Sequence, residues 1–186
     1  MPRITNIEDF DGFEEKLNRL GLAPLYEQAI DAALGFRLEV EPTRFANGTQ
    51  GIRKTIDQRF GPLPGWVNIK SGGVDWKASN ANGASLAVEI QVSGRSDLLA
   101  IDVLHLRGEM RLGRVDVGVI VVPDDQLSRF LTDRTPNMRT ALKHVRNNAP
   151  ELPIRIVAFG HDGEGASLDK AITNRGLGKP RPDKIS

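Results

Sequence analysis

The chain has 186 residues, with 25 basic, 24 acidic and no cysteine side chains. Its length suits one domain over residues 1–186, and the lack of cysteine excludes disulfides, zinc-thiolate sites, iron–sulfur clusters and a cysteine nucleophile. No segment reaches membrane-spanning length and no basic leader precedes an apolar run, so we expect a cytoplasmic protein with no membrane partner.

The charges are unevenly distributed along the chain. Residues 1–41 carry nine acidic and four basic side chains, and the remainder carries 21 basic and 15 acidic ones. The later part is therefore better suited to a phosphate backbone. An ordinary mixed surface would show the same distribution.

Two helices are predicted near the N-terminus, and together they form a helical scaffold over residues 6–35. The first begins after an N-cap at Asn6 and ends near Leu20, before Gly21. The second begins at Pro24 and ends at Gly35. Their apolar positions follow helical spacing: Phe10, Phe13, Leu17 and Leu20, then Leu25, Ala29, Ile30, Ala33 and Leu34.

An acidic pair, Glu27 and Asp31, lies on the polar face of the second helix. Such a pair at i,i+4 is usually a solvated surface. The alternative is that one of these carboxylates assists a metal site.

The next segment contains a strand, a helix and a second short strand. Residues 36–41 alternate apolar and charged side chains, which predicts a strand with one solvated face. Thr49 or Gln50 begins a helix that ends at Phe60, and residues 66–69 begin a strand after the breaking sequence GPLPG. The basic side chains on or near this helix, Arg53, Lys54 and Arg59, are compatible with phosphate contact, although a solvated face is their default interpretation.

Residues 72–97, GGVDWKASNANGASLAVEIQVSGRSD, predict a hairpin whose two strands carry polar side chains. Because alternate residues of a strand share a face, Glu89 and Gln91 point one way. The core-facing set is Leu86, Val88, Ile90 and Val92. Asp75 joins Glu89 on one face only if paired residue numbers have an even sum, so we predict a turn of odd length or a bulge.

A helix from Ser96 or Asp97 to about Gly108 is apolar nearly all round. So wide an apolar surface needs two partners, the sheet and either the rest of the fold or a second copy of the chain. Residues 115–122, VDVGVIVV, predict a strand buried on both faces.

Helices are then predicted from Asp124 or Asp125 to Leu131 and, after Pro136, to Asn147. Residues 152–158 predict another buried strand, residues 168–174 a short helix, and residues 175–186 a loose basic tail. The basic stripe Arg139, Lys143 and Arg146 suits a phosphate backbone, although a solvated face is its default interpretation. The three histidines lie on different elements and indicate no metal cluster.

Two carboxylates on neighbouring strands are suited to a hard divalent cation. The order of elements over residues 66–160, with Asp75 on one strand and Glu89-x-Gln91 on the next, resembles the PD-(D/E)XK nuclease fold. The usual lysine is replaced by Gln91, and Val74 precedes Asp75 in place of proline. The Glu-x-Gln variant is similar to restriction endonucleases of the BglII and BstYI type, relatives of BamHI.

This resemblance implies an α/β, restriction-endonuclease-like fold with a mixed central sheet flanked by helices. It implies that Asp75, Glu89 and the backbone carbonyl of Ile90 bind Mg²⁺ and that Gln91 orients the attacking water. A glutamine is neither a cation nor a general base, so strict metal dependence is expected.

Further side chains are candidates for DNA contact, each with a structural alternative. Lys77 would contact the scissile phosphate or merely flank the site, and Arg95 is a second phosphate candidate. Asn80 and Asn82 offer amides suited to base edges, although a hairpin turn alone explains them. Arg139 and Lys143 complete the set.

The sequence therefore predicts a magnesium-dependent type II restriction endonuclease that cuts double-stranded DNA as a homodimer. A companion methyltransferase is compatible with this prediction, with no stable complex expected. The alternatives are a structure-selective or repair nuclease of the same fold, and a non-catalytic DNA-binding protein with a vestigial site. The recognition sequence is not fixed by one sequence, because loops and dimer geometry place the reading side chains.

Overall fold

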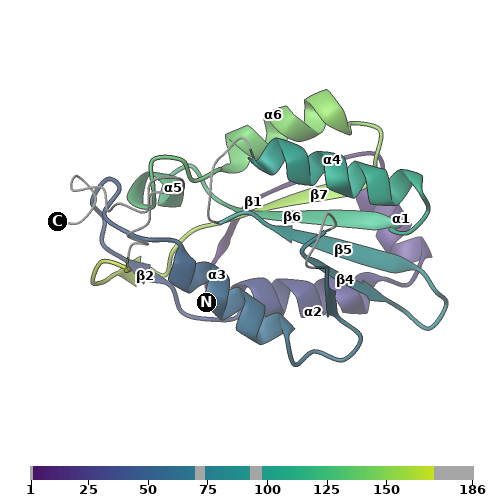
Figure 1. Ribbon diagram of the computed structural model, residues 1–186, viewed down its shortest axis with the longest axis horizontal. Coiled ribbons are helices and arrows are strands. Elements are labelled where there is room, and N and C mark those ends of the chain that lie inside the picture. The colour runs from purple at the N-terminus through teal and green to yellow at the C-terminus, as the bar shows by residue number, and fades with distance from the viewer. Residues whose placement is uncertain (1, 70–73, 93–97, 170–186) are drawn as a thin grey trace.

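The computed structural model describes residues 2–69, 74–92 and 98–169 (Figure 1). Its elements are, in chain order, β1 (Ile4–Asp9), α1 (Phe13–Arg19), α2 (Ala23–Leu34), β2 (Glu39–Val40), α3 (Gln50–Phe60), β3 (Val67–Asn68), β4 (Trp76–Ser79), β5 (Ser85–Ile90), α4 (Leu98–Arg111), β6 (Val117–Pro123), α5 (Leu127–Phe130), α6 (Met138–Asn148), β7 (Ile154–Phe159) and β8 (Gly163–Glu164). Within these ranges no helix is long and apolar enough to cross a membrane.

Six strands form the central sheet in the order β1-β7-β6-β5-β4-β3. The three strands β5, β6 and β7 are parallel to one another, and the remaining pairs in this sheet are antiparallel. A separate small sheet pairs β2 with β8 in parallel. The mixed sheet follows from the connections, because parallel neighbours need long crossovers whereas β4 and β5 are joined by a tight hairpin.

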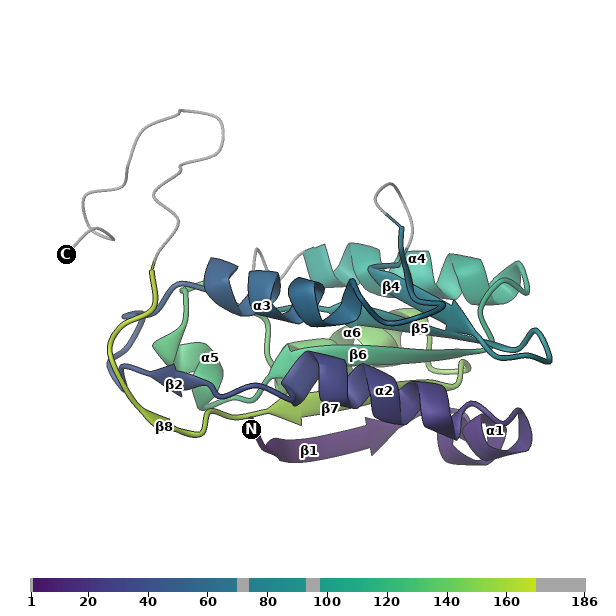
Figure 2. The ribbon, with the colours of Figure 1, turned by 90° about the horizontal axis from the view of Figure 1, so that it is seen from below.

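Helices cover both faces of the central sheet, so the fold has three layers (Figures 1 and 2). Helices α1, α2 and α3 pack on one face, and α4 and α6 pack on the other. The strand β6 is buried on both faces, as its apolar run predicted: Val119 and Val121 face the first layer, and Ile120 and Val122 face the second.

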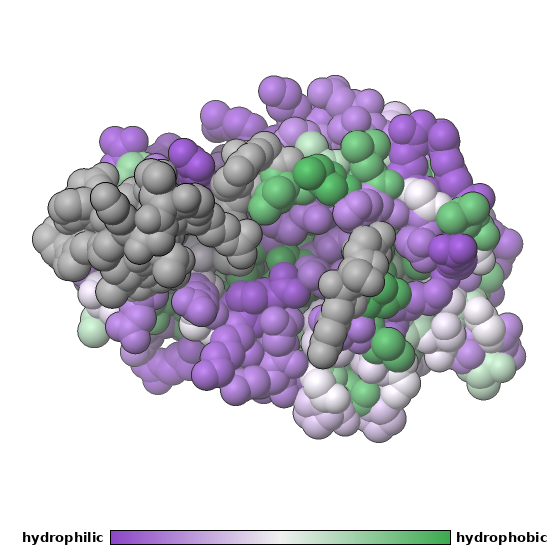
Figure 3. Space-filling view, in the orientation of Figure 1, coloured by the Kyte–Doolittle hydropathy of each residue, from purple (hydrophilic) through white to green (hydrophobic). Residues whose placement is uncertain are grey.

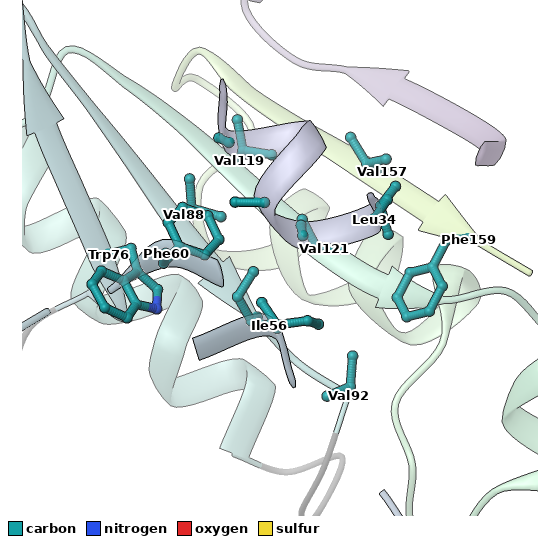
Figure 4. Packing of buried hydrophobic residues seen from close by; sticks show 14 of the residues in the cluster. Leu34, Ile56, Phe60, Trp76, Val88, Val92, Val119, Val121, Val157 and Phe159 are labelled. Carbon is teal, nitrogen blue, oxygen red and sulfur yellow. The ribbon is translucent and has the colours of Figure 1, made fainter. Parts of the chain in front are cut away.

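Aromatic packing fixes α3 against the hairpin (Figure 4). The ring of Phe60, the last residue of α3, stacks on Trp76 of β4 with ring centroids 5.1 Å apart and planes 14° apart. The rings of Phe60 and Trp66 pack edge to face, with their centroids 5.1 Å apart. This contact holds the C-terminal end of α3 over β4 and so fixes how the helix lies beside the start of that strand.

On the other face, Gly118 of β6 allows α4 to approach the sheet closely. A Cβ atom at this position would lie 2.6 Å from Cδ2 of Leu106, closer than carbon atoms pack. The side chains of α4 that face the sheet, Leu99, Val103 and Leu106, are fully buried. The first part of α4, from residue 98 to residue 106, therefore packs closely against the sheet.

The predicted helix from Asn6 to Leu20 is wrong in its first half, because residues 4–9 form β1 and the helix begins only at Phe13. The spacing of Phe10, Phe13 and Leu17 favoured a helix, but β1 gains an antiparallel ladder with β7. The N-terminal scaffold is therefore a strand followed by two helices.

Most other predicted elements are confirmed within a few residues. The helices α2, α3 and α4 begin and end close to the predicted positions, and the strands β6 and β7 are buried as expected. The strand predicted over residues 36–41 is reduced to β2, and α5 is shorter than predicted. Leu168 and Asp169 are not helical, and the rest of the predicted helix 168–174 and the tail 175–186 lie outside the described residues.

Candidate active site

The hairpin register places Asp75 opposite Glu89, as the even-sum rule required. Trp76 pairs with Val88 and Lys77 with Ala87, so one further step of the same register brings Asp75 to Glu89. Residues 80–84 connect the strands, which gives the predicted turn of odd length. Gly83 adopts a φ of 84°, a left-handed conformation that favours glycine in such a turn.

The alternation along β5 is also confirmed. Val88 and Ile90 belong to the core beneath α1, α2 and α3. Glu89 and Gln91 point to the other face, where Ala87 packs in the cluster beneath α4 and α6. They are only 2% and 9% exposed, so the polar face of this strand is enclosed, although the alternation alone did not predict its burial.

Asp75 lies in a bend directly before β4, and its contacts join the ends of the two hairpin strands. Its Oδ2 atom accepts a hydrogen bond of 2.8 Å from the backbone N–H of Ile90. Its own backbone N–H donates to Oε2 of Glu89 at 3.4 Å. The two carboxylates are therefore brought to one end of β5.

Arg53 of α3 reaches this point from the first helical layer. Its Nη2 atom donates to Oδ1 of Asp75 at 2.8 Å, and its Nη1 atom donates to Oδ2 at 3.1 Å. The same Nη1 atom donates to the carbonyl oxygen of Ile90 at 2.9 Å. The Asp75 carboxylate and the Ile90 carbonyl thus converge on one nitrogen.

Asp102 of α4 reaches the site from the opposite layer. Its Oδ2 atom accepts a short hydrogen bond from Nε2 of Gln91. Because a carboxylate only accepts, this contact turns the amide nitrogen toward α4, and the acceptor atom of the same amide is Oε1. Side chains from both faces of the sheet therefore meet at the end of β5.

Two carboxylates of this site, those of Glu89 and Asp102, have raised pKa values. Burial, followed by the charges of Asp75 and Asp102, raises the pKa of Glu89 well above its ordinary value. Burial, followed by the charge of Asp75, raises the pKa of Asp102 to about 6, against the lowering effect of its bond to Gln91.

This arrangement fits a divalent cation in its donor chemistry. Oε1 of Glu89 is buried and has no hydrogen-bond partner among the described residues, which is costly for an ionised group. Carboxylate and carbonyl oxygens are the ligands of hard cations. No group of three or more His, Asp or Glu side chains in the described part of the chain is arranged to hold a metal ion, so a backbone oxygen would have to contribute.

The asparagines of the hairpin turn lie far from this site. The four residues of β4 lie between Asp75 and Asn80, so the two positions are about 16 Å apart along the strand. Asn80 holds the turn against the α1–α2 connection, because its Nδ2 atom donates to the carbonyl of Leu20 and its Oδ1 atom accepts from the backbone of Asn82 and Ala84. The hairpin turn therefore accounts for Asn80, whereas the side chain of Asn82 is exposed.

The basic candidates are dispersed. Lys77 is half-buried on β4, and Arg95 lies outside the described residues. Arg139 and Lys143 are exposed on α6, where Arg139 lies 3.6 Å from Asp125.

The acidic pair of α2 is engaged elsewhere. Asp31 pairs with Arg59 at 3.0 Å. Together with Glu27 it lines a cavity beside Pro2 and Ile4 at the start of β1. The structure therefore gives no support for their assistance to the site at Asp75.

Sequence reasoning did not assign Asp102 or the pairing of Arg53 with Asp75. Asp102 is the one acidic residue between Leu98 and Leu106, on a helix that directly follows the Glu-x-Gln strand, and that isolation was a usable signal. Arg53 offered none, because basic residues on a polar helix face are common.

Comparisons with known proteins place this geometry in context. A family model described as restriction endonuclease BglII/BglIII matches residues 21–159. The crystal structure of restriction endonuclease BglII complexed with a DNA 16-mer matches with a TM-score of 0.62 and 18% sequence identity, over 86% of this chain and 78% of that one. The crystal structure of free BglII matches with a TM-score of 0.53 and 18% identity, over 91% and 81%. No curated protein matches the chain. The predicted fold class is confirmed.

Proposed function

The chain belongs to the restriction endonuclease BglII/BglIII family and is a DNA endonuclease, and we propose that it is a magnesium-dependent homodimer that cuts double-stranded DNA at one specific sequence. Membership confirms the family resemblance inferred from the sequence. The metal, the dimer and the roles of individual residues are the parts that we propose here.

The observation that carries the proposal is the meeting of Asp75 and Glu89 at the end of β5. Asp75 binds the backbone of Ile90 at 2.8 Å, and Glu89 accepts from the backbone of Asp75 at 3.4 Å. In addition, the buried Oε1 atom of Glu89 has no hydrogen-bond partner among the described residues, and a cation would stabilise the ionised form of this carboxylate.

In this proposal Asp75, Glu89 and the carbonyl of Ile90 hold Mg²⁺. When bound, the ion supplies stabilisation of charge on the phosphoryl oxygens and lowers the pKa of a bound water. Neither task can be performed by Gln91, which has no charge and does not titrate. Activity without a divalent ion is therefore not expected.

Gln91 positions the water that attacks the phosphorus atom. Its Nε2 atom is engaged by Asp102, so the Oε1 atom is the one left to accept a hydrogen bond from that water. An acceptor held in place by a buried neighbour loses little freedom during the reaction. Asp102 acts through Gln91 as a positioning residue.

The homodimer is supported by an exposed apolar face on α4 (Figure 3). Leu98, Ile101 and Leu104 are exposed by 36%, 46% and 46%, although they belong to a helix whose opposite side is buried. A two-fold contact of two such faces would bury them. A two-fold protein also matches the symmetry of a palindromic duplex site, with one active site for each strand.

Phosphate contacts are assigned to the basic side chains nearest the carboxylates. Lys77 stands two residues beyond Asp75 on β4 and is half-buried. Arg139 and Lys143 on α6 are exposed and suited to more distant phosphates. A companion DNA methyltransferase that forms no stable complex with this protein is compatible with the proposed activity.

The direct test is digestion of a long, fully sequenced, unmodified duplex by the purified protein with Mg²⁺. Discrete fragments whose mapped ends share one sequence are expected. Glu89→Ala should abolish cleavage while leaving the circular dichroism spectrum intact, because its side chain contributes to no core cluster.

Two other patterns would refute this proposal. Nicks at branched or damaged positions without a common sequence would indicate a structure-selective nuclease. Salt-sensitive DNA binding that is unchanged by Mg²⁺ and by Asp75→Ala, with no cleavage, would indicate a vestigial site.

A further inference from the structure

The guanidinium of Arg53 occupies the acceptors that a cation would use. Both carboxylate oxygens of Asp75 and the carbonyl oxygen of Ile90 accept its protons at 2.8 to 3.1 Å. A guanidinium and a divalent ion compete for these oxygens, because their like charges repel at such short range.

We propose that Arg53 is a built-in counter-cation of the active site, which the divalent ion must displace before the site becomes competent. This inference rests on the proposed function, since it concerns the same carboxylates. It adds a residue that controls metal affinity and that the family resemblance did not indicate.

The Arg53 guanidinium also has an anchor outside the proposed metal ligands. Its Nε atom donates to both carboxylate oxygens of Asp57, at 3.1 and 3.0 Å, one helical turn further along α3. Asp57 is itself held by the indole Nε1 of Trp76 at 3.1 Å. The guanidinium can therefore release Asp75 and keep a partner.

Arg53 also has a way out of the site. Its side chain is 24% exposed and that of Asp75 is 22% exposed, so both lie at the edge of the protein interior. By contrast, Glu89 is enclosed. Displacement then requires rotation of one side chain toward solvent and no rearrangement of the sheet.

Competition of this kind lowers the apparent metal affinity by the fraction of molecules in which Arg53 has moved away. Removing the Arg53 guanidinium should therefore raise the apparent metal affinity. We expect Arg53→Ala and Arg53→Gln to bind Ca²⁺ at least about tenfold more tightly than the unaltered protein in the absence of DNA. Arg53→Gln keeps a polar partner for Asp57 and serves if Arg53→Ala folds poorly.

The measurement is calorimetric titration of metal-free protein with Ca²⁺, followed by the shift of the thermal unfolding midpoint on adding Ca²⁺. Arg59→Ala is the matched control, because Arg59 is on the same helix but binds Asp31 and the carbonyl of Ala32. It removes an equal charge and should leave Ca²⁺ affinity unchanged. Combining Asp75→Asn with Arg53→Ala should abolish the gain.

Equal or weaker Ca²⁺ binding by both Arg53 variants overturns the inference, as does an equal gain in Arg59→Ala. Cleavage by the unaltered protein is measured separately. If it cuts DNA with Mg²⁺ and the Arg53 variants show no gain, only the inference fails. If the variants show an Asp75-dependent gain and no DNA is cut, the inference holds and the proposed function fails.

Discussion

Gln91, which directly follows β5, and Asp102 of α4 are joined by a hydrogen bond that links the sheet to the helices on one of its faces. The bond runs from the amide Nε2 atom to the carboxylate. It fixes which end of the Gln91 amide faces the substrate side, and it makes the position of α4 part of the proposed chemistry.

Removing this bond should slow cleavage without preventing DNA binding. We expect Asp102→Ala to lower the single-turnover cleavage rate at saturating Mg²⁺ by about 10- to 100-fold, as loss of an orienting partner commonly does. The substrate concentration for half-maximal rate should change little. Asp102→Asn retains a side-chain oxygen acceptor for Nε2 and should lose much less. Equal losses in both variants would show that the charge, and not the orientation, matters.

Glu89 should limit the stability of the metal-free protein. A buried carboxylate with an unpartnered oxygen and like-charged neighbours is unfavourable when ionised. Glu89→Gln should therefore raise the free energy of unfolding at neutral pH by about 0.5–2 kcal/mol, the range typical of stabilising changes at functional sites. Denaturation in the presence of a chelator measures this change, and the same variant should not cleave DNA. A less stable variant would contradict the prediction.

The pH dependence of metal-free stability has a defined sign. The folded state raises the pKa of Asp102 from 3.8 to about 6, first through burial and then through Asp75. The stabilisation is full below the ordinary pKa and is lost as pH rises through about 6, because the folded state binds the proton more tightly. Glu89 acts in the same direction.

Urea denaturation of the metal-free protein across this pH window tests the assignment. The unaltered protein should lose more stability on going from the acidic to the neutral end than Asp102→Asn does. The difference between the two curves reports the titration of Asp102 together with the effect of its charge on Glu89. Parallel curves would mean that Asp102 does not titrate in this range.

The apolar face of α4 should determine the oligomeric state. We expect Ile101→Asp or Leu104→Glu to convert a dimer to a monomer in light scattering after gel filtration, since a charge on a buried two-fold contact appears twice. Ile7→Glu is the control, because Ile7 on β1 is similarly exposed, by 43%, on a different element. A monomeric unaltered protein, or dissociation by the control alone, would contradict this interface.

The hairpin could be predicted because its determinants are local. Alternation along Ser85–Ile90 separates Glu89 from Val88 and Ile90, and a turn of odd length gives the even-sum register that brings Asp75 to Glu89. Helix boundaries such as Gly35 and Phe60 were also fixed by nearby breaking residues.

The errors arose where a distant partner decided the outcome. Residues 4–9 became a strand because β7 offers them an edge about 150 positions later in the chain. Likewise, nothing in the sequence around Arg53 marks it, and Asp102 is marked only by its isolation among apolar residues. The packing of α3 and α4 on opposite faces of one sheet brings them to Asp75 and Gln91. Such information is absent from local periodicity.

The pairing of β1 with β7 also sets an order of events during synthesis. Thr5 bonds to Ala158 across 153 positions, whereas the hairpin of β4 and β5 closes over only a few. Local contacts form quickly and distant ones slowly. On the ribosome, the acidic hairpin can therefore assemble early, while the sheet stays open at one edge until β7 has emerged. The strand β1 is synthesised first but can pair only after β7 has been synthesised.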